Sequence, residues 1–282
     1  FDLPQKEYAL PTPMLNIING GKHADNGIDF QEYMILPHAL TFAEKIRMAS
    51  EIYFQLGALL RSKGLQTLVG DEGGFAPKCV TNHQPLDLLS EAIGRTPYRS
   101  GSDVTFGLDI AASEFYLPEQ HRYFLTLEKK LLDSSELIAR YKELVTTYPL
   151  TSIEDGLAEE DWDGWVALTQ QCTKNLLLVG DDLFVTNRQR LERGVTTGAA
   201  NAILIKPNQI GTLTETMETI TSAQKNGYTI VISHRAGETS DAFIADLAVA
   251  VQAPYIKAGA VARGERLAKY NRLLEIEQEL AE

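Results

Sequence analysis

Cysteine is scarce in this sequence, which has only Cys79 and Cys172 among its 282 residues. Two isolated cysteines exclude a disulfide framework and a Cys-x-x-Cys metal site. A chain of this length buries most of its apolar surface and needs no such cross-links. We therefore expect a protein of the reducing cytoplasm, with one large α/β domain or two smaller ones.

Positive charge is in the minority, because 26 Lys and Arg face 38 Asp and Glu and leave a net charge of −12. An acidic surface argues against nucleic acid and anionic membranes as main partners. Long uncharged apolar runs are missing as well, since the most apolar late segment, 242–256, is interrupted by Asp246 and Gln252. We therefore expect neither a membrane span nor a signal peptide.

What the chain does have is a series of short runs rich in Val, Ile and Leu, alternating with helical patterns. The runs are 14–19, 31–36, 104–109, 150–154, 176–181, 202–206, 229–233 and 254–257. Strands that are apolar throughout are typical of a parallel sheet covered on both faces. Eight of them predict an α/β fold of the TIM-type (β/α)8 barrel class. A doubly wound open sheet is the alternative, but it calls for a Gly-x-Gly-x-x-Gly turn, which is missing.

The helical patterns between these runs have recognisable ends. Thr41 with Glu44, and Asp133 with Glu136, have the spacing of a capping box at a helix start. Glycine follows two of the patterns at the position where helices commonly stop. The expected helices span 41–63, 133–147, 212–226, 241–251 and 263–280.

Ionisable residues stand at or just past the C-terminal ends of six consecutive predicted strands. They are Asp109, Glu154, Asp181, Lys206, His234 with Arg235, and Lys257. A single charge at a strand end usually just reaches water, but in a barrel these ends converge on one mouth, where active sites lie. The series therefore predicts an active site built from these residues.

Three of these residues are carboxylates from successive strands, Asp109, Glu154 and Asp181. Carboxylates crowd together only around a cation, and an all-oxygen site favours Mg²⁺ over zinc. Three separate salt bridges are the alternative. Lys206 beside such a site could act as a base if burial and neighbouring positive charge lower its pKa. These features predict metal-assisted removal of a proton next to a carboxylate.

Three loop segments add further candidates. GDEGGFAP places Glu72 before paired glycines, where the backbone can approach a ligand closely. GGKHADNG puts His23 in a turn without the spacing of a P-loop, and Gln31 with Glu32 begins the second strand. Each is a weak signal alone. Trp162 and Trp165 are interpreted as helix packing.

Long segments of the chain resemble the enolase family, in order and over essentially the whole length. They are PTPMLNIINGGKHADNGIDFQEYMILP, GDEGGFAP, GLDIAASEFY, SIEDGLAEEDWDGW, GDDLFVTN, ILIKPNQIGTLTE, SHRAGETSD and RLAKYNRLLEIE. Enolases dehydrate 2-phosphoglycerate to phosphoenolpyruvate, and the resemblance implies that reaction here. It also implies a barrel variant whose second strand is antiparallel, which is compatible with two strands that have no helix between them.

The resemblance implies a role for each site residue. Asp109, Glu154 and Asp181 would hold the first Mg²⁺, and Lys206 would take the proton from C2. Glu72, supported by Glu32, would protonate the departing hydroxyl. The remaining roles fall to substrate-binding groups: Lys257 at the carboxylate, Arg235 with His234 at the phosphate, His23 closing over the site and Gln31 supporting the glutamates.

Several features depart from the family pattern. The N-terminal domain expected before PTPMLN is missing, and the chain opens at Phe1 with a linker-like stretch. We therefore expect a piece of a longer protein or a processed product, with residues 1–10 as a linker stub and 11–282 as the catalytic barrel. The full-length protein is expected to be a homodimer.

A second departure lies in the phosphate-binding segment, where Ala236 stands in place of an expected serine. Losing a hydrogen bond to a charged group costs about 1.5–3 kcal/mol, roughly tenfold to over a hundredfold in affinity. Ala258, Val261 and Gly264 also differ near Lys257. These changes leave two alternatives open: an enolase-like barrel that binds without turnover, and another metal-dependent carboxylate enzyme of the wider superfamily.

Overall fold

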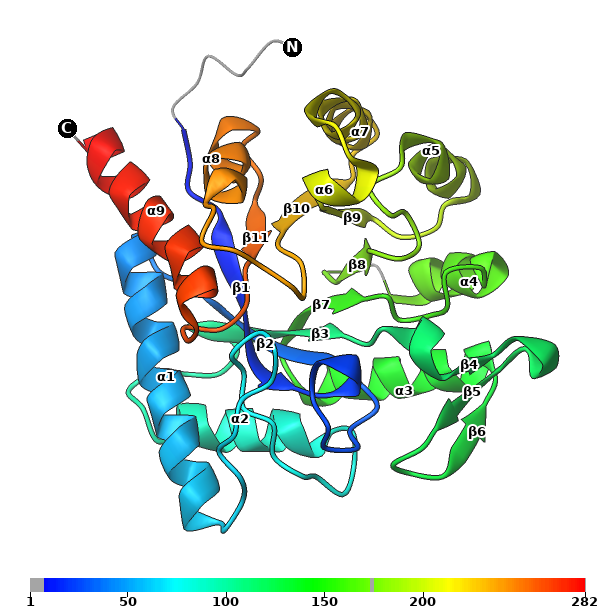
Figure 1. The fold of residues 1–282 in the computed structure, drawn as a ribbon. Helices are drawn as coiled ribbons and strands as arrows, with labels where there is room; N and C mark the ends of the chain where they lie inside the picture. Colours follow the sequence, from blue (N-terminus) through cyan, green and yellow to red (C-terminus); the bar gives the residue numbers. More distant parts are fainter. Residues whose placement is uncertain (1–7, 173–174, 282) are drawn as a thin grey trace.

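The computed structural model describes residues 8–172 and 175–281, so residues 1–7 of the expected linker lie outside the described part. Within these residues, eight strands form a closed barrel surrounded by helices (Figure 1). The barrel strands are β1 (Thr12–Asn19), β2 (Glu32–Pro37), β3 (Val104–Asp109), β7 (Leu150–Glu154), β8 (Leu177–Gly180), β9 (Ala202–Ile205), β10 (Thr229–Ser233) and β11 (Tyr255–Lys257). The predicted (β/α)8 barrel is confirmed, and the open-sheet alternative is wrong.

The order around the barrel is β1-β11-β10-β9-β8-β7-β3-β2. Strand β2 runs antiparallel to both of its neighbours, as the family resemblance implied, and the other pairs are parallel. The reversal pairs Glu32, at the start of β2, with Asp109, at the end of β3. Because β2 is reversed, its first residue reaches the same end of the barrel as the last residues of the parallel strands.

The predicted helices are present, with the expected caps. Thr41 Oγ1 accepts a hydrogen bond from Glu44 N, and Asp133 and Glu136 form a capping box. The helices are α1 (Phe42–Ser62), α2 (Gln84–Gly94), α3 (Ser134–Thr147), α4 (Trp162–Cys172), α5 (Arg188–Thr197), α6 (Pro207–Ile210), α7 (Leu213–Lys225), α8 (Phe243–Ala250) and α9 (Gly264–Ala281). The expected helix ranges did not include α2, α4, α5 or the single turn α6, although Trp162 and Trp165 of α4 were interpreted as helix packing.

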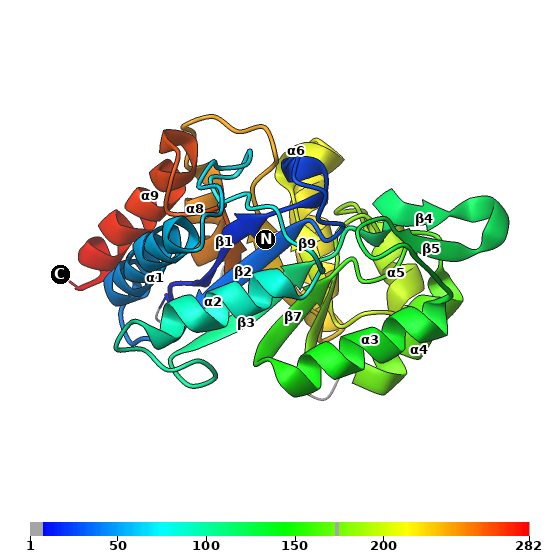
Figure 2. The same ribbon diagram turned by 90° about the horizontal axis from the view of Figure 1, so that it is seen from below.

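A small antiparallel sheet was not predicted either. It consists of β4 (Tyr116–Leu117), β5 (Arg122–Leu125) and β6 (Lys130–Leu132) and projects from the barrel near α3 and α4 (Figure 2). Three short 3₁₀ turns complete the described elements: η1 (Gly21–His23), η2 (Ala112–Phe115) and η3 (Pro118–Gln120).

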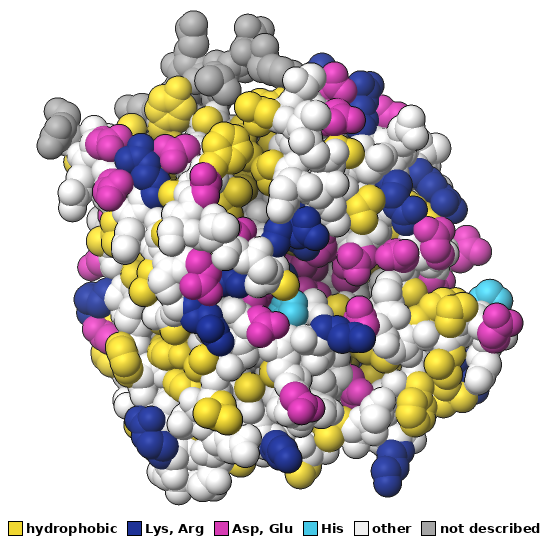
Figure 3. All heavy atoms as spheres, in the orientation of Figure 1, with side chains coloured by type: hydrophobic (Ala, Val, Ile, Leu, Met, Phe, Trp, Pro, Cys, Tyr) yellow, Lys and Arg dark blue, Asp and Glu magenta, His cyan; other side chains and the backbone are white. Residues whose placement is uncertain are grey.

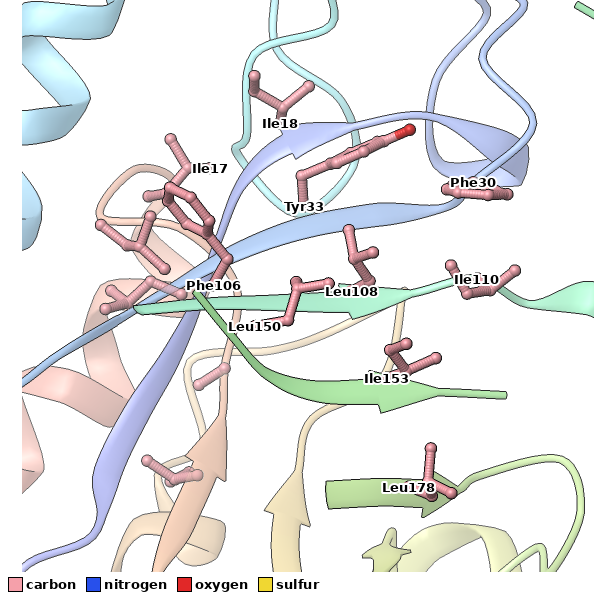
Figure 4. Close-up of a cluster of buried hydrophobic side chains, with 14 of the residues drawn as sticks. Ile17, Ile18, Phe30, Tyr33, Phe106, Leu108, Ile110, Leu150, Ile153 and Leu178 are labelled. Carbon is pink, nitrogen blue, oxygen red and sulfur yellow. The ribbon is translucent and has the colours of Figure 1, made fainter. Parts of the chain in front are cut away.

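Two clusters of buried side chains form the core. The larger one lies between the strands and the helices, and Figure 4 shows Leu108, Ile153 and Leu178 projecting into it from neighbouring strands. The smaller one fills the barrel and includes Leu204 and Val231. Strand residues therefore alternate between an outward face toward the helices and an inward face toward the barrel axis.

In the part of the chain that the structure describes, none of the helices combines the length and the apolar character needed to cross a membrane.

Candidate active site

On several strands, every second residue faces the barrel axis, and the last residue of this inward-facing row is ionisable. On β9, Ala202 and Leu204 belong to the cluster inside the barrel, and Lys206 continues that alternation by two residues. Val179 of β8 is followed in the same way by Asp181. The apolar strand β9 is thus followed by the ammonium group of Lys206, because this inward-facing position lies at the mouth of the barrel and not in its apolar core.

A cavity of about 400 Å³ lies at this mouth. Every predicted site residue lines it except Glu154. The lining residues among those predicted are His23, Gln31, Glu32, Glu72, Asp109, Asp181, Lys206, His234, Arg235, Ala236 and Lys257. Figure 3 shows a hollow near the middle of this face, with acidic side chains inside it and basic side chains and a histidine at its edge. Asn208, Ser233 and Gly237 also line the cavity and were not predicted.

Lys257 lies at the centre of the acidic groups. Its buried Nζ is 2.8 Å from Glu154 Oε1, 3.0 Å from Asp109 Oδ2 and 3.1 Å from Glu32 Oε2. Burial alone would lower the pKa of Lys257, but the surrounding carboxylates, Asp109 first, raise it well above its usual value. The Lys257 ammonium therefore stays charged. Through its contact with Lys257, Glu154 is connected to the site although it does not line the cavity.

Lys206 forms an ion pair with Asp181, in which Nζ contacts Oδ2. Burial and the charge of Lys257 both lower the pKa of Lys206, as expected from the sequence. The net shift is nevertheless upward, because the Asp181 carboxylate and the more distant Glu154 outweigh these two effects. The expectation of a lowered pKa for Lys206 is therefore wrong for the site with this ion pair formed.

Glu72 and Glu32 form a second group with two histidines. Glu72 Oε1 is 3.1 Å from His234 Nε2, and Glu32 Oε1 is 3.4 Å from His23 Nδ1. Burial and the neighbouring Glu72 raise the pKa of Glu32 well above its usual value. Burial would raise the pKa of Glu72 too, but His234, His23 and Lys257 together hold it well below. Of the two carboxyl groups, Glu32 therefore binds a proton more readily than Glu72.

Close backbone packing fixes the loop that carries Glu72. A Cβ atom on Gly70 would lie 2.5 Å from the carbonyl oxygen of His23, and one on Gly74 would lie 2.5 Å from Asn19 Oδ1. These contacts leave room only for glycine, so the GDEGG loop sits directly against the end of β1. From β1, Asn16 Nδ2 donates a hydrogen bond to Glu72 Oε2 at 3.0 Å.

The rim of the cavity is basic on one side. The Arg235 guanidinium is half-buried and donates to Asn208 Oδ1 at 3.2 Å. Ala236 lines the cavity beside it and has no hydroxyl to offer a ligand. Gln31 Nε2 reaches Asp109 Oδ2 at 3.5 Å on the second strand's side. An anionic group would therefore meet positive charge at this rim, although the protein as a whole is acidic.

Two of the three predicted metal ligands have a free oxygen atom, whereas both oxygens of Asp109 accept hydrogen bonds. Among the described residues, Glu154 Oε2 and Asp181 Oδ1 are buried side-chain atoms without a hydrogen-bond partner. Burial raises the pKa of Glu154 well above its usual value, and the nearby charges of Asp109 and Asp181 raise it further. Buried, unpartnered carboxylate oxygens that repel one another are a donor set that fits a hard divalent cation.

Two other acidic groups could also bind a metal. His23, Glu32 and Glu72 bring ligand atoms within 4.8 Å of one another, and so do Asp155, Asp181 and Asp182. All of the first group lines the cavity, and the second group reaches the cavity through Asp181.

Some residues that shape the site were missed by the sequence reasoning. Asp155 accepts hydrogen bonds from the backbone N–H groups of Asp181 and Asp182, at 2.9 and 2.8 Å. Asn16 and Arg266 contact Glu72 and His234. For Asn16 the alternation along β1 was an available signal, because it follows the inward-facing Met14 by two residues. For Arg266 the sequence held no comparable signal.

Comparison with known proteins identifies a family that this chain matches. The model of the family described as "Enolase, C-terminal TIM barrel domain" matches residues 7–282. The enolase of Helicobacter pylori strain J99 is 56% identical over 272 residues, which cover 96% of this chain and 64% of that protein. The enolase of Helicobacter hepaticus is 53% identical over 274 residues, or 97% of this chain and 64% of that protein. The chain thus spans 64% of the length of these relatives.

Proposed function

The chain belongs to the enolase family, and from that membership we propose that its barrel catalyses the Mg²⁺-dependent dehydration of 2-phosphoglycerate to phosphoenolpyruvate. The products are phosphoenolpyruvate and water, so the activity is that of a hydro-lyase of glycolysis and gluconeogenesis.

One observation carries this proposal: a single cavity is lined by a lysine, two neighbouring carboxyl groups whose pKa values are shifted in opposite directions, and carboxylates suited to a cation. Loss of water from a 2-phosphoglycerate needs a base at C2 and an acid at the C3 hydroxyl. It also needs positive charge at the substrate's carboxylate and phosphate. The cavity offers a candidate for each of these needs.

Lys206 is the proposed base. Its neutral amine would take the C2 proton, and the electron pair of the C–H bond would become negative charge shared with the carboxylate. Burial and the charge of Lys257 favour the neutral amine, and the Asp181 ion pair opposes it. A substrate proton next to a carboxylate is weakly acidic, so charge stabilisation around the enolate must supply much of the rate.

Glu72 and Glu32 form the proposed acid. The C3 hydroxyl leaves as the C2–C3 double bond forms, and a proton from the pair converts it to water. Glu32, whose pKa is raised, is the proposed holder of the proton, and Glu72 is the member that accepts one hydrogen bond from Asn16 and lies against His234. Transfer within the pair would bring the proton to Glu72 in the reaction.

The remaining cavity residues are proposed to bind the substrate. Lys257 would hold the carboxylate, while Arg235 and His234 would hold the phosphate at the basic rim. His23, beside the Glu32–Glu72 pair, would close over the substrate, and Gln31 would steady Asp109 and the glutamates. Ala236 would contact the phosphate only through its methyl group and backbone.

Asp109, Glu154 and Asp181 are the residues that would hold Mg²⁺. When bound, the ion would neutralise these carboxylates, draw Asp181 charge away from Lys206 and stabilise the negative charge of the enolate.

The test is phosphoenolpyruvate formation from 2-phosphoglycerate by the full-length protein and by this chain, with Mg²⁺ and with a chelator. We expect Mg²⁺-dependent turnover that Lys206→Ala lowers at least about a hundredfold, because a positioned general base contributes that much or more. Lys225→Ala, which removes an exposed lysine on α7, serves as the matched control.

Turnover that survives in Lys206→Ala would remove Lys206 from the role of base. A full-length protein that forms no phosphoenolpyruvate with Mg²⁺ would overturn the proposed function itself. We further propose that the full-length protein acts in the cytoplasm as a homodimer, which cell fractionation and sedimentation of that protein would test.

A further inference from the structure

Arg266 is a buried cation that the proposed reaction does not use. Its guanidinium lies in the first turn of α9, and the residue is only 1% exposed. It donates to His234 Nδ1 at 2.5 Å, to the carbonyl oxygens of Arg235 and Ala236 at 2.7 and 2.6 Å, and to that of Asp71 at 3.3 Å. A buried charge with this many partners has a specific structural task, because leaving it unpaired would be costly.

The contact with His234 fixes the chemistry of that ring. A guanidinium has N–H donors and no acceptor, so His234 Nδ1 must be the acceptor and carries no proton. In a neutral imidazole the proton is then on Nε2. That nitrogen lies 3.1 Å from Glu72 Oε1, without the alignment of a hydrogen bond, so its proton faces the Glu72 carboxylate at ion-pair distance. The opposite tautomer would place two donors against each other at Nδ1 and two acceptors against each other at Nε2.

The charges around His234 also favour the neutral ring. Burial lowers the pKa of His234, Glu72 opposes this, and the cations Arg266 and Lys257 lower it further. A second proton on Nδ1 would point directly at the Arg266 guanidinium. The geometry therefore excludes His234 as a proton acceptor through Nδ1.

Arg266 also connects the two loops that deliver the site's key side chains. One loop carries His234, Arg235 and Ala236, and the other carries Asp71 next to Glu72. The stem of Arg266 is held in turn, because a Cβ atom on Gly259 would lie 2.9 Å from Arg266 Cδ. One turn further along α9, the buried Lys269 ammonium continues the anchoring with contacts to Glu238 Oε2 at 2.9 Å and Thr239 O at 2.6 Å.

We propose that Arg266 is a positioning residue that holds His234 as the neutral, Nε2-protonated tautomer and thereby keeps an N–H group beside the Glu72 carboxylate. The tautomer assignment stands on the contacts alone, and its importance for acid catalysis by Glu72 rests on the proposed function. The N–H group of His234 then faces Glu72, and helix α9, through Arg266, fixes which ring nitrogen carries the proton.

The experiment reads the tautomer directly. The chain has five histidines, so a long-range ¹H–¹⁵N correlation spectrum of the ¹⁵N-labelled protein near pH 7.5 resolves each ring. Protonated and unprotonated ring nitrogens resonate far apart, and His234→Gln identifies the His234 signals by their loss. We expect the pattern of a proton on Nε2 in the wild-type chain. A scalar coupling between Arg266 Nη1 and His234 Nδ1 across their hydrogen bond is expected as well.

Arg266→Met removes the guanidinium, and we expect the His234 nitrogen signals to move toward those of a mixed tautomer. Arg272→Met is the matched control, because Arg272 lies on the same helix in ion pairs with Asp246, Glu275 and Glu279 and not at the cavity. It should leave the His234 signals unchanged. In the full-length protein, Arg266→Met is expected to lower kcat on the order of a hundredfold, as misplaced catalytic groups do.

A wild-type His234 with its proton on Nδ1, or on both nitrogens, would overturn the proposal whether or not Arg266→Met folds. A folded Arg266→Met with an unchanged His234 pattern would overturn it too. Failure of the proposed function is distinguishable: the expected tautomer in a protein without dehydratase activity would leave the Arg266 assignment standing.

Discussion

Ala236 is the residue at which this chain departs from the family pattern inside the cavity. It lines the cavity beside Arg235, with its backbone carbonyl bound to Arg266. Ala236→Ser would add a hydroxyl donor at the basic rim without displacing a neighbour, because the residue is exposed. We expect about tenfold to a hundredfold tighter binding of 2-phosphoglycerate, the value of a hydrogen bond to a charged group. Titration calorimetry on the full-length protein with Mg²⁺ measures this.

Ala236→Val is the control for that change, since it enlarges the side chain without adding a donor. If valine and serine altered the affinity alike, a hydrogen bond to the phosphate would not be the cause. An unchanged affinity in the serine variant would mean that the substrate's phosphate does not reach residue 236.

Asp155 holds the backbone from which Asp181 projects. Its two carboxylate oxygens accept from Asp181 N and Asp182 N, and its own backbone has a φ of 42°, which asparagine tolerates. In Asp155→Asn the side-chain amide would turn a donor toward one of these N–H groups. We expect Mg²⁺ to bind about 10–100-fold more weakly, the usual effect of losing a partner that orients a ligand.

Calorimetric titration of Mg²⁺ into the variant checks this expectation. Asp246→Asn provides the comparison, because it removes a carboxylate of an exposed ion pair on α8. Equal Mg²⁺ affinity in wild type and Asp155→Asn would show that Asp181 needs no such support.

At the scale of single residues, the convergence of the predicted side chains on one cavity followed from the alternation of each strand. Lys206 and Asp181 stand two positions beyond inward-facing apolar residues, so their location could be read from the pattern. The direction of the Lys206 pKa could not, because it depends on how closely Asp181 approaches. Arg266 was not predictable, because its partners are loop carbonyl oxygens about thirty residues away and more. The catalytic and binding roles stay predictions.

At the scale of elements, helix α9 anchors the loop that carries Arg235. Glu238 takes part, since its oxygens accept from Lys269 Nζ at 2.9 Å and from Arg235 N at 3.1 Å. Partial burial would raise the pKa of Glu238. The hydrogen bonds outweigh burial, with the largest effect from Lys269, and hold this pKa below its usual value of 4.5. The ionised side chain is therefore the form that stabilises the docked loop.

The pH dependence follows from that direction. A carboxylate with a lowered folded-state pKa stabilises the fold fully above its unfolded pKa, near 4.5, and the stabilisation is lost as the pH falls through the folded value. Glu238→Gln should therefore cost about 1.5–3 kcal/mol at pH 7, as for a charge-assisted hydrogen bond, and progressively less below pH 4.5. Urea unfolding at several pH values between 3 and 7 measures the difference.

Glu279→Gln is the comparison on the same helix, because Glu279 forms an exposed ion pair with Arg272 and should contribute less than about 1 kcal/mol. A Glu238→Gln destabilisation that stayed constant from pH 7 down to pH 3 would contradict the assignment of the ionised form.

Several of the elements that the sequence did not predict have no clear hydrophobic period, although α2 does and was missed all the same. Helix α5 buries only Leu191 and Gly194, so its apolar stripe is too thin to recognise. The strands β4, β5 and β6 have two to four residues each, and β6 has no buried residue. The eight barrel strands were predictable because each is apolar and buried on both faces.

At the scale of the whole molecule, the barrel gathers acidic groups from strands that are far apart in sequence. Asp109, Glu154 and Asp181 come from β3, β7 and β8, and reversed β2 adds Glu32 to the same end. Burial raises the pKa of Glu154, repulsion by the other carboxylates raises it further, and Lys257 offsets part of this effect. The closed sheet maintains this crowding, which no single element would sustain.

A cation that binds these three strands should therefore stabilise the entire fold. At a Mg²⁺ concentration a hundred times its Kd, linkage contributes about 2.7 kcal/mol, which corresponds to a rise in Tm of roughly 5 °C for a chain of this size. Differential scanning calorimetry of this chain with Mg²⁺ and with EDTA measures the shift.

Asp181→Asn should abolish the Mg²⁺-dependent rise in Tm, since Asp181 supplies one of the unpartnered oxygens. Asp163→Asn, an exposed carboxylate at the start of α4, should retain it in full. An equal shift in Asp181→Asn would place the stabilising cation elsewhere on the acidic surface and remove the main physical support for a metal at the mouth of this barrel.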